Sequence, residues 1–310
     1  MPEQNFHIGY IGLGKMGSNM VERLCEMGHS VSAYDPAQAA RDRLANIDNA
    51  TAYDNYQAMI ETLPAKNRII WVMVPSSVTT EVITTLSELA NTEDIIIDGG
   101  NTNYQHTLEH HKVLSKRQIN FIDVGVSGGP TGARTGACMM IGGDKDIFDR
   151  IKKLFIDLTV SDGYEYVGPV GSGHFVKMIH NGIEYGMMQA IAEGFNLLHK
   201  ADFNIDLSKV AKVYNHGSVI QSALINWLYQ GYQKHGKNLE SIKGSVDHSG
   251  EGQWTVDFAK RINQPAEIIE RSLEFRKNST NNTSYTGQVL STLRNEFGGH
   301  NAIIKTDDKA

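Results

Sequence analysis

The feature that most constrains the fold is a glycine-rich segment near the start of the chain, GYIGLGKMGSNM, which contains Gly12-x-Gly14-x-x-Gly17. It follows a β-rich run and opens a helical pattern. Glycines at this spacing permit a tight turn and a close approach of the backbone to a pyrophosphate, and the helix N-terminus favours negative charge. Asp35 ends the next β-rich run about 20 residues later, where an acid can bind a ribose. The segment therefore predicts a dinucleotide site.

Short β-rich runs alternate with helical patterns over the first half of the chain. The runs span residues 6–12, 29–35, 68–75, 94–100 and 119–126, and two more follow at 138–143 and 164–169. This alternation is typical of a mostly parallel sheet with helices on both faces. Only helical patterns follow the last run. We therefore expect an α/β fold with a doubly wound, Rossmann-like domain over residues 1–170 and an all-α substrate and oligomerisation domain over 171–310.

The residues around Asp35 bear on which dinucleotide binds. A carboxylate there accepts hydrogen bonds from ribose hydroxyls and repels a 2′-phosphate. The next residue, Pro36, supplies no cation, and Arg41 and Arg43 are expected to be solvated on a helix. NAD is therefore the expected cofactor, with NADP as the alternative. The predicted contacts are Gly12, Leu13, Gly14, Lys15, Met16, Gly17 and Asp35.

A second informative segment is GHFVKMIHNGIEYGMMQAIAEGF, residues 173–195, which has the pattern of a helix. Lys177, His180, Asn181 and Glu184 lie at offsets that place them on one stripe of that helix. An exposed helix face would explain the stripe, but the other faces are apolar. A lysine held away from water becomes a usable base near neutrality, and a glutamate there becomes a usable acid. The stripe therefore predicts the wall of a catalytic cleft.

Composition excludes several other classes of function. The net charge of −6 provides no broad basic field for nucleic acid. No run approaches the ~20 apolar residues of a membrane span, and no secretory signal is recognisable at the N-terminus. The only cysteines, Cys25 and Cys138, argue against a disulfide scaffold and favour the reducing cytoplasm. His106 and His110 have a metal-like spacing without an evident cysteine or carboxylate partner, so we expect surface histidines and no metal site.

Five segments together resemble the 6-phosphogluconate dehydrogenase family. They are GLGKMG, DGGN (98–101), GVSGGPTGA (125–133), GHFVKMIHNGIEY and RNEFGGH (294–300). The block K-x-x-H-N-x-x-E-Y is the most specific, because the wider group of β-hydroxyacid dehydrogenases usually has asparagine in place of His180 and lacks Glu184. The chain resembles the short form of the family, which lacks a long helical extension and often prefers NAD.

The resemblance implies a decarboxylating reaction of the pentose phosphate pathway. Lys177 would deprotonate the C3 hydroxyl of 6-phosphogluconate during hydride transfer and then polarise the resulting ketone, so that CO2 leaves. Glu184 would protonate C1 of the enediol to give ribulose 5-phosphate. Val74 and Asn101 would lie along the cofactor; strand-end packing is the alternative for Val74. The remaining substrate contacts implied by position are Asn101, Ser127, Gly128, Gly129, His180 and Asn181; a simple loop is the alternative for Ser127–Gly129.

The resemblance also implies a phosphate pocket, formed by Tyr185, Thr255 and Arg276 and completed by Arg294 and His300 of a neighbouring subunit. Paired guanidinium donors suit phosphate. One position departs from the family: Gln253 stands where Lys or Arg is usual. The expected site therefore has one cation fewer, which leaves room for a differently substituted sugar acid.

The C-terminal part of the sequence suggests how subunits associate. A polar stretch at 277–287 precedes a short helix and the segment LRNEFGGHNAIIK. This pattern favours a tail that leaves its own subunit and completes a neighbouring active site in a homo-oligomer, either a dimer or a tetramer. Two alternatives to the leading function remain: a β-hydroxyacid dehydrogenase that does not decarboxylate, and a dinucleotide-binding protein without turnover.

Overall fold

The computed structural model describes residues 5–248 and 250–303. The chain forms two compact units, Met1–Met178 and Ile179–Ala310, which are treated separately below. The division lies inside the long helix α8 (Ser172–Lys200). The expected boundary at residue 170 instead coincides with the start of that helix.

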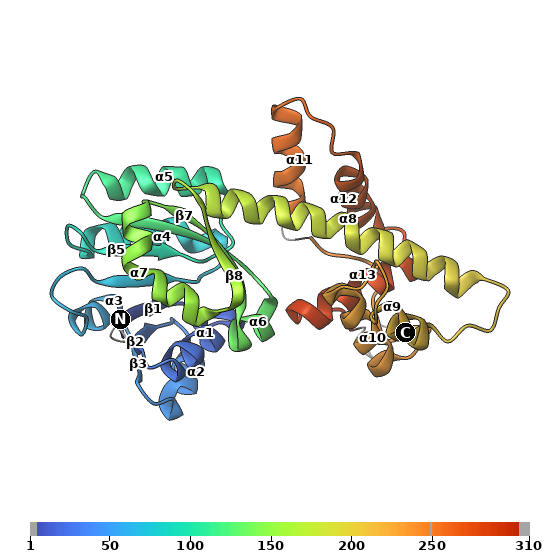
Figure 1. The fold of residues 1–310 in the computed structure, drawn as a ribbon, viewed down its shortest axis with the longest axis horizontal. Coiled ribbons are helices and arrows are strands. Elements are labelled where there is room, and N and C mark those ends of the chain that lie inside the picture. Colours follow the sequence, from blue (N-terminus) through green and yellow to red (C-terminus); the bar gives the residue numbers. More distant parts are fainter. Residues whose placement is uncertain (1–4, 249, 304–310) are drawn as a thin grey trace. The chain divides into compact units, whose positions relative to one another are not determined.

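The first unit is built on one sheet (Figure 1). Its described strands follow the order β3-β2-β1-β4-β5-β6-β7-β8. The strands are β1 (His7–Ile11), β2 (Ser30–Tyr34), β3 (Ala50–Tyr53), β4 (Ile69–Val72), β5 (Ile95–Asp98), β6 (Asn120–Ser127), β7 (Ala137–Gly143) and β8 (Thr159–Gly168). Neighbouring strands are parallel except for β6 and β7, which are antiparallel. The sheet confirms the predicted doubly wound, mostly parallel fold.

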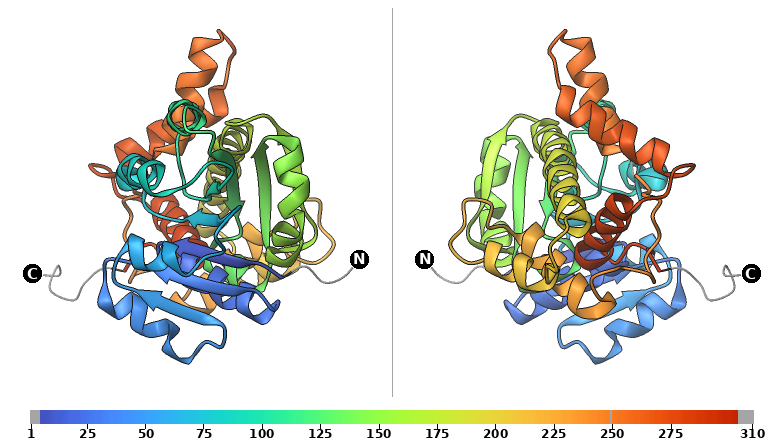
Figure 2. Two further views of the ribbon diagram at one scale, coloured as in Figure 1. Left: turned by 90° about the vertical axis from the view of Figure 1, so that its left-hand side faces the viewer. Right: turned by 90° about the vertical axis from the view of Figure 1, so that its right-hand side faces the viewer.

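Helices cover both faces of this sheet (Figure 2). They are α1 (Lys15–Glu26), α2 (Gln38–Asp42), the 3-10 helix η1 (Arg43–Asn46), α3 (Tyr56–Glu61), α4 (Ser76–Leu89), α5 (Tyr104–Ser115), α6 (Gly129–Thr135) and α7 (Lys145–Leu158). Successive residues of a strand point to opposite faces. Trp71 of β4 packs in the core beneath α1 and α7, whereas its neighbours Ile70 and Val72 pack beneath α3, α4 and α5.

Three elements of the first unit were not expected from the sequence: β3, α3 and α6. Strand β3, at the edge of the sheet, is only half-buried and lacks an apolar run. Helix α6 begins at Gly129, the last residue of the segment for which a simple loop was the alternative. All three elements are short, and short elements carry little periodic signal.

The second unit is helical, as predicted. It contains most of α8 together with α9 (Leu207–Tyr214), α10 (Ala223–His235), α11 (Glu251–Arg261), α12 (Glu267–Ser279) and α13 (Tyr285–Gly298). Its main core is formed by α8, α9, α10 and α13, with Leu228, Leu290 and Leu293 fully buried. A smaller core formed by Val256, Leu273 and Tyr185 joins α11 and α12 to α8.

The C-terminal segment differs from the expectation that it leaves its own subunit. Residues 285–298 form α13, whose apolar side lies in the core of its own unit. Beyond α13, Ala302 is also buried there, and Ile303 forms a β-bridge with Ile242. The apolar residues of the described part therefore find partners in the same chain, and the completion of a neighbouring active site by this segment stays a prediction; residues 304–310 lie outside the described residues.

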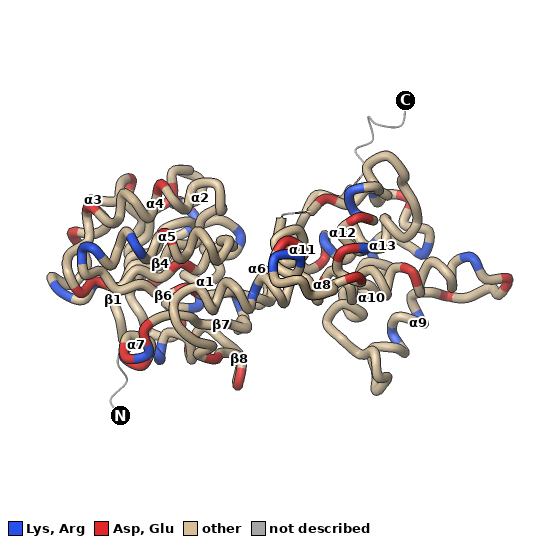
Figure 3. Tube along the Cα trace, turned by 90° about the horizontal axis from the view of Figure 1, so that it is seen from above, with Lys and Arg blue, Asp and Glu red and all other residues tan. Residues whose placement is uncertain are grey.

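Charged residues of both signs are interspersed along each unit (Figure 3). None of the helices in the described ranges combines the length and the apolar character needed to cross a membrane.

Candidate active site

The glycine-rich turn lies at the carboxyl end of β1 and opens α1. Gly12 has φ +100°, and a Cβ atom there would come within 2.2 Å of the Met73 carbonyl oxygen. A Cβ atom at Gly17 would lie 1.9 Å from the Gly12 carbonyl oxygen, whereas one at Gly14 would meet nothing within 4 Å. The first and third glycines therefore allow tight packing, and the middle one leaves open space in front of the helix N-terminus. This geometry suits a pyrophosphate.

Asp35 is fixed beside this turn by backbone donors. Its Oδ2 accepts a hydrogen bond from the Leu13 amide at 2.8 Å, and its Oδ1 accepts one from the Ala37 amide at 2.8 Å. Arg41 donates to the carbonyl oxygens of Asp35 at 2.5 Å and Pro36 at 3.1 Å. Arg41 therefore clamps the turn that carries the acid, which differs from the solvated role expected for it. The arrangement fits a dinucleotide whose ribose hydroxyls face a carboxylate.

The other predicted cofactor contacts lie at or beside the glycine turn. Lys15, the first residue of α1, is exposed, and Met16 packs against the core below it. Val74 follows β4, and its Cγ1 would be 3.1 Å from a Cβ atom at Gly12. Strands β1 and β4 are neighbours at the point where the strand order reverses, which is where open α/β sheets bind their ligands.

Asn101 follows β5 and is exposed at the end of a turn that Asp98 holds. The Asp98 side chain is fully buried, and its two oxygens accept hydrogen bonds from the Gly100 amide at 3.0 Å and the Thr102 hydroxyl at 2.9 Å. The turn is thus rigidly supported from below. Its position at the carboxyl end of a neighbouring strand places Asn101 at the same edge of the sheet as the glycine turn.

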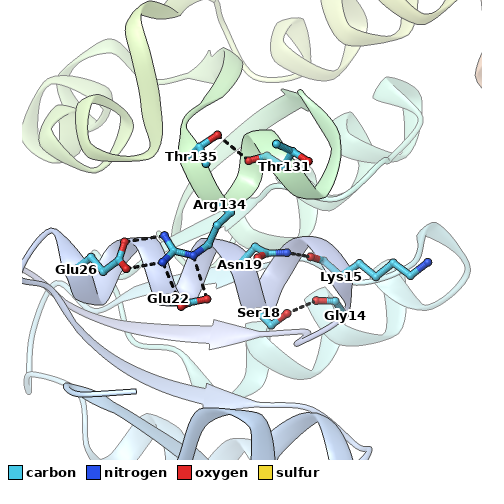
Figure 4. Close-up of polar contacts among 9 residues, drawn as sticks. All are labelled: Gly14, Lys15, Ser18, Asn19, Glu22, Glu26, Thr131, Arg134 and Thr135. Carbon is cyan, nitrogen blue, oxygen red and sulfur yellow. Dashed lines mark hydrogen bonds and ion pairs between the residues drawn. The ribbon is translucent and has the colours of Figure 1, made fainter. Parts of the chain in front are cut away.

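Ser127 ends β6, and Gly128 and Gly129 carry the chain into α6 with φ +119° and +61°. These positive φ values are strained for residues with a side chain. Helix α6 is tied to α1 by Arg134, which lies between two glutamates of α1 (Figure 4). Arg134 Nε is 3.1 Å from Glu22 Oε2, and Arg134 Nη1 donates to Glu26 Oε2 at 2.7 Å. The segment 127–129 and the glycine turn are therefore held by two helices joined through one guanidinium.

The first turn of α8 is fixed to the sheet by a buried carboxylate. Asp123 of β6 accepts hydrogen bonds from the Gly171 amide at 2.7 Å and the His174 amide at 2.8 Å. The His174 amide belongs to the first turn of α8, where backbone N–H groups lack intrahelical partners, and Gly171 directly precedes the helix. Asp123 is fully buried and thus anchors the end of α8 that carries Lys177.

Lys177 rests on a glycine of β6. A Cβ atom at Gly125 would lie 2.3 Å from Lys177 Cβ and 2.8 Å from the Gly173 carbonyl oxygen. Any side chain at position 125 would therefore push α8 away from the sheet. Gly125 and Ser127 point to the same side of β6, since they are two residues apart on one strand. The half-buried Lys177 thus lies on the side of β6 to which Ser127 points.

Further along α8, in the second unit, the other members of the polar stripe are partly shielded from solvent. His180 Nδ1 is 3.1 Å from Asn181 Oδ1 and 3.9 Å from Glu184 Oε2. The side chains of His180 and Glu184 are 36% and 23% exposed. Residues three and four positions apart are neighbours on a helix, so His180 and Glu184 lie on one face of α8.

Arg276 of α12 is the most unusual charge in the second unit. It is 2% exposed, and its guanidinium carbon lies 3.4 Å from the centre of the Tyr185 ring. Its Nη2 donates to Met188 Sδ at 3.5 Å, and its Nε has no hydrogen-bond partner among the described residues. Burial lowers the pKa of the Arg276 guanidinium to about 10. A buried cation beside a ring and a thioether retains donors for an anion.

The structure brings two more of the predicted phosphate residues to this part of the second unit. Thr255 contacts α8, since a Cβ atom at Gly182 would lie 2.6 Å from Thr255 Cγ2. Arg294 is buried and close enough to Arg276 to contribute to lowering its pKa. The contribution of Arg294 and His300 to the phosphate pocket of a neighbouring subunit stays a prediction. His300 is exposed and packs edge-on against Phe297, with ring centres 6.1 Å apart.

Sequence reasoning missed the residues that support the site. Asp98 ends the apolar strand β5 and Asp123 lies inside β6, and a lone carboxylate in such a run was the available signal. The contact of Arg134 with α1 had no signal, because its partners are more than a hundred positions away. His110 was expected at the surface but is 4% exposed, with Nε2 hydrogen-bonded to the Thr80 hydroxyl.

Comparisons with known proteins agree with this arrangement. Residues 7–168 match the family model for the NAD binding domain of 6-phosphogluconate dehydrogenase, and residues 173–296 match the model for its C-terminal domain. A Bacillus subtilis protein, YqeC, whose description as a 6-phosphogluconate dehydrogenase is itself provisional, is 44% identical over 94% of this chain and 98% of its own length. The NAD(+)-dependent, decarboxylating 6-phosphogluconate dehydrogenase of Haloferax volcanii is 34% identical over 97% of this chain and 99% of its own.

A solved structure extends the likeness to three dimensions. The 6-phosphogluconate dehydrogenase of Plasmodium falciparum, studied with NADP+ and with 6-phosphogluconate, matches with a TM-score of 0.79 and 26% identity. The match covers 97% of this chain and 67% of that one. Since both domain models and relatives of full length agree, the chain belongs to the 6-phosphogluconate dehydrogenase family and is an oxidoreductase of that type with an NAD-binding domain.

Proposed function

We propose that the chain catalyses the oxidative decarboxylation of 6-phosphogluconate to ribulose 5-phosphate and CO2, with NAD preferred over NADP. The observation that carries this proposal is the support of Lys177. A buried carboxylate fixes the first turn of its helix, and the absence of a side chain at Gly125 lets the lysine lie close to the sheet. Such support is what a general base needs, because catalysis depends on the position of the proton acceptor.

Lys177 performs two successive tasks in the proposed reaction. Its neutral amine takes the proton from the C3 hydroxyl while the C3 hydride is transferred, and bound NAD supplies the acceptor for that hydride. The resulting ammonium donates a hydrogen bond to the new C3 ketone oxygen. This bond stabilises the negative charge that develops on that oxygen when the bond between C1 and C2 breaks and CO2 leaves.

Glu184 completes the reaction. Loss of CO2 leaves an enediol, and proton transfer from the Glu184 carboxyl to its terminal carbon gives the ketose product. Glu184 lies two turns beyond Lys177 on α8 and is partly shielded, at 23% exposure of its side chain. His180 and Asn181, on the same stripe, are proposed to hold the substrate hydroxyls, together with Asn101 and the segment 127–129.

The fixed carboxylate of Asp35 supports the preference for NAD. A 2′-phosphate would bring a second negative charge to this carboxylate, and the nearest guanidinium, that of Arg41, already donates to two backbone carbonyl oxygens. The buried Arg276 beside Tyr185 supports a phosphorylated substrate. Both features come from residues that the sequence had singled out for these roles.

We further propose that the protein works as a homo-oligomer, a dimer or a tetramer, in the cytoplasm. Large apolar side chains on α8 are exposed in the second unit, including Ile183 at 54%, Met187 at 45% and Leu197 at 73%, and a second subunit would cover them. The free cysteines Cys25 and Cys138 suit a reducing compartment. Sedimentation at decreasing concentration, with activity measured in parallel, tests the association.

The decisive experiment measures CO2 and NADH together on 6-phosphogluconate with each cofactor. Equal amounts of the two products, with higher kcat/KM for NAD, are expected. NADH without CO2 would instead identify a dehydrogenase that does not decarboxylate, and the absence of both would leave a dinucleotide-binding protein. Lys177→Met provides the control, because it should abolish turnover and leave the binding of NAD intact.

A further inference from the structure

The chain lacks a cation at position 253, but a lysine from another helix reaches this position. The Lys277 ammonium donates to Gln253 Oε1 at 2.6 Å, and Gln253 Nε2 donates to Asp257 Oδ1 at 2.7 Å. Gln253 and Asp257 belong to α11, whereas Lys277 belongs to α12 and directly follows Arg276. A neutral amide thus holds the ammonium beside α11. Among the described residues no carboxylate lies within ion-pair distance of Lys277, so its charge is not cancelled by a direct partner.

The charge of Lys277 and the charges of two buried guanidinium groups act on the same residue, His248. Burial and then Lys277, Arg276 and Arg294, in that order, lower the pKa of His248, which lies in the segment leading into α11. Glu251 opposes this effect. The charges of Lys277, Arg276 and Arg294 therefore all act on the segment before α11. Like charges repel one another, and gathering them is costly unless an anion joins them.

Two further features point to an anion at this place. Helix α11 spans 11 residues and follows Gly250, which has φ +102° and no side chain that could cap the helix. The first backbone N–H groups of a helix attract negative charge. Independently, the 2% exposed Arg276 has an Nε without a hydrogen-bond partner. Thr255, which lies on α11 two residues after Gln253, adds a hydroxyl.

We propose that Lys277 determines substrate specificity by supplying to the substrate phosphate the positive charge that Gln253 does not. Gln253 acts as its holder, because its side-chain oxygen fixes the ammonium next to α11. The inference rests on the proposed function, since it takes a phosphorylated sugar acid as the substrate. It assigns a part in binding to a lysine that sequence analysis left unassigned, and it accounts for the missing cation without a different substrate.

Moving the charge between the two positions tests the idea. Lys277→Gln should raise KM for 6-phosphogluconate about tenfold, the value of one charge-assisted hydrogen bond, with kcat changed less than about twofold. The double variant Lys277→Gln with Gln253→Lys should bring KM back to within about threefold of the original value. Lys260→Gln is the matched control, because Lys260 is an exposed lysine of α11 paired with Glu270. Its KM should not change.

A second measurement does not depend on turnover. Inorganic phosphate should bind to the intact protein in calorimetry, and Lys277→Gln should weaken that binding about tenfold. If 6-phosphogluconate is converted but Lys277→Gln keeps the original KM, the role of Lys277 is refuted and the proposed function stands. If KM rises and the double variant does not restore it, the charge itself is not what matters, and the inference is again refuted. If 6-phosphogluconate is not converted at all, the proposed function fails, and phosphate binding still decides whether Lys277 is an anion ligand.

Discussion

The first unit buries carboxylates near its candidate site, whereas the second unit buries a guanidinium. The buried groups differ in how many of their hydrogen bonds are formed within the protein. Asp98 and Asp123 are fully buried, and each side chain accepts two hydrogen bonds from groups of its own unit. Arg276 is buried just as deeply, but its contacts are a ring face and a sulfur atom, and its Nε has no partner among the described residues.

The two units are therefore prepared for ligands in different ways. In the first unit, the charges hold the turns and the helix end that carry Asn101 and Lys177, so the cofactor edge is complete without a ligand. In the second unit, the buried charge has not recovered the free energy lost on leaving water. An anionic ligand would supply the missing hydrogen bonds. We therefore propose that the first site is a rigid scaffold and that the second is a receptor, in which binding of an anion offsets the free energy lost by burying Arg276.

The largest effect should come from disturbing the scaffold under Lys177. Gly125→Ala places a methyl group 2.3 Å from Lys177 Cβ and 2.8 Å from the Gly173 carbonyl oxygen. Helix α8 must shift, and we expect kcat to fall about 100-fold, the loss typical of a displacement of about 1 Å in a catalytic group. NAD affinity, measured by fluorescence titration, should change little, because the glycine turn lies on another strand. Gly194→Ala is the control, since a Cβ atom there meets nothing within 4 Å; unchanged kcat in Gly125→Ala would contradict the placement of Lys177.

The comparison itself is tested by removing one buried charge from each unit. Asp123→Asn should lower the free energy of unfolding by about 2 kcal/mol, because its amide cannot accept both backbone hydrogen bonds. Arg276→Met should change it by less than about 1 kcal/mol or raise it, because the lost charge was incompletely paired. Urea unfolding measures both, and the exposed Asp162→Asn is the control for the first. If Asp123→Asn and Arg276→Met lowered the free energy of unfolding equally, the distinction between scaffold and receptor would be wrong.

Much of the scaffold could be predicted because its signals are local. The run at residues 69–72 is apolar throughout and forms the buried β4, and the glycine turn lies directly after β1, as its spacing indicated. The antiparallel direction of β7 was not predicted. Direction depends on the connection, and here the seven residues of α6 join β6 to β7 without a full crossover.

The supporting contacts of the site could not be predicted because they join distant parts of the chain. The sequence singled out Arg276 and Gln253 only through resemblance, and nothing in it paired Lys277 with Gln253, 24 positions away. Burial was equally hidden: an arginine on a polar helix is usually exposed. Arg276 is buried because α12 packs against α8. The pattern of residues along one helix does not reveal which helix packs against it.

A smaller effect is expected on cofactor preference, which also depends on the scaffold of the first unit. Asp35→Ala removes the carboxylate that the Leu13 and Ala37 amides hold, and with it the repulsion of a 2′-phosphate. The ratio of kcat/KM for NAD to that for NADP should fall about tenfold, equivalent to about 1.4 kcal/mol. Steady-state kinetics with both cofactors measure it, with the exposed Asp54→Ala as the control. A ratio that stays constant in Asp35→Ala would mean that selection lies elsewhere.

The smallest effect should appear in the pH dependence of the free energy of unfolding. It concerns His29, a basic side chain of the first unit whose two ring nitrogens both have hydrogen-bond partners. Its Nδ1 accepts the Phe6 amide at 3.0 Å, and its Nε2 donates to Asp157 Oδ2 at 2.7 Å, an oxygen that Lys153 also contacts. Burial lowers the pKa of His29, although Asp157 opposes the shift. The unfolded chain, with the ordinary histidine pKa of about 6.5, then binds the proton more readily than the folded chain.

The contribution of His29 to the free energy of unfolding is therefore fully present above that ordinary pKa and decreases as the pH falls below it. Urea unfolding at about pH 7.5 and about pH 5.5 should show a smaller loss in His29→Gln than in the unaltered protein. His216→Gln, which alters an exposed histidine of the second unit, should leave the loss unchanged. An identical pH dependence in the unaltered protein and His29→Gln would show that protonation does not break the Phe6 hydrogen bond. The first unit would then hold a protonated His29 without loss of stability, just as the second unit holds the buried charge of Arg276.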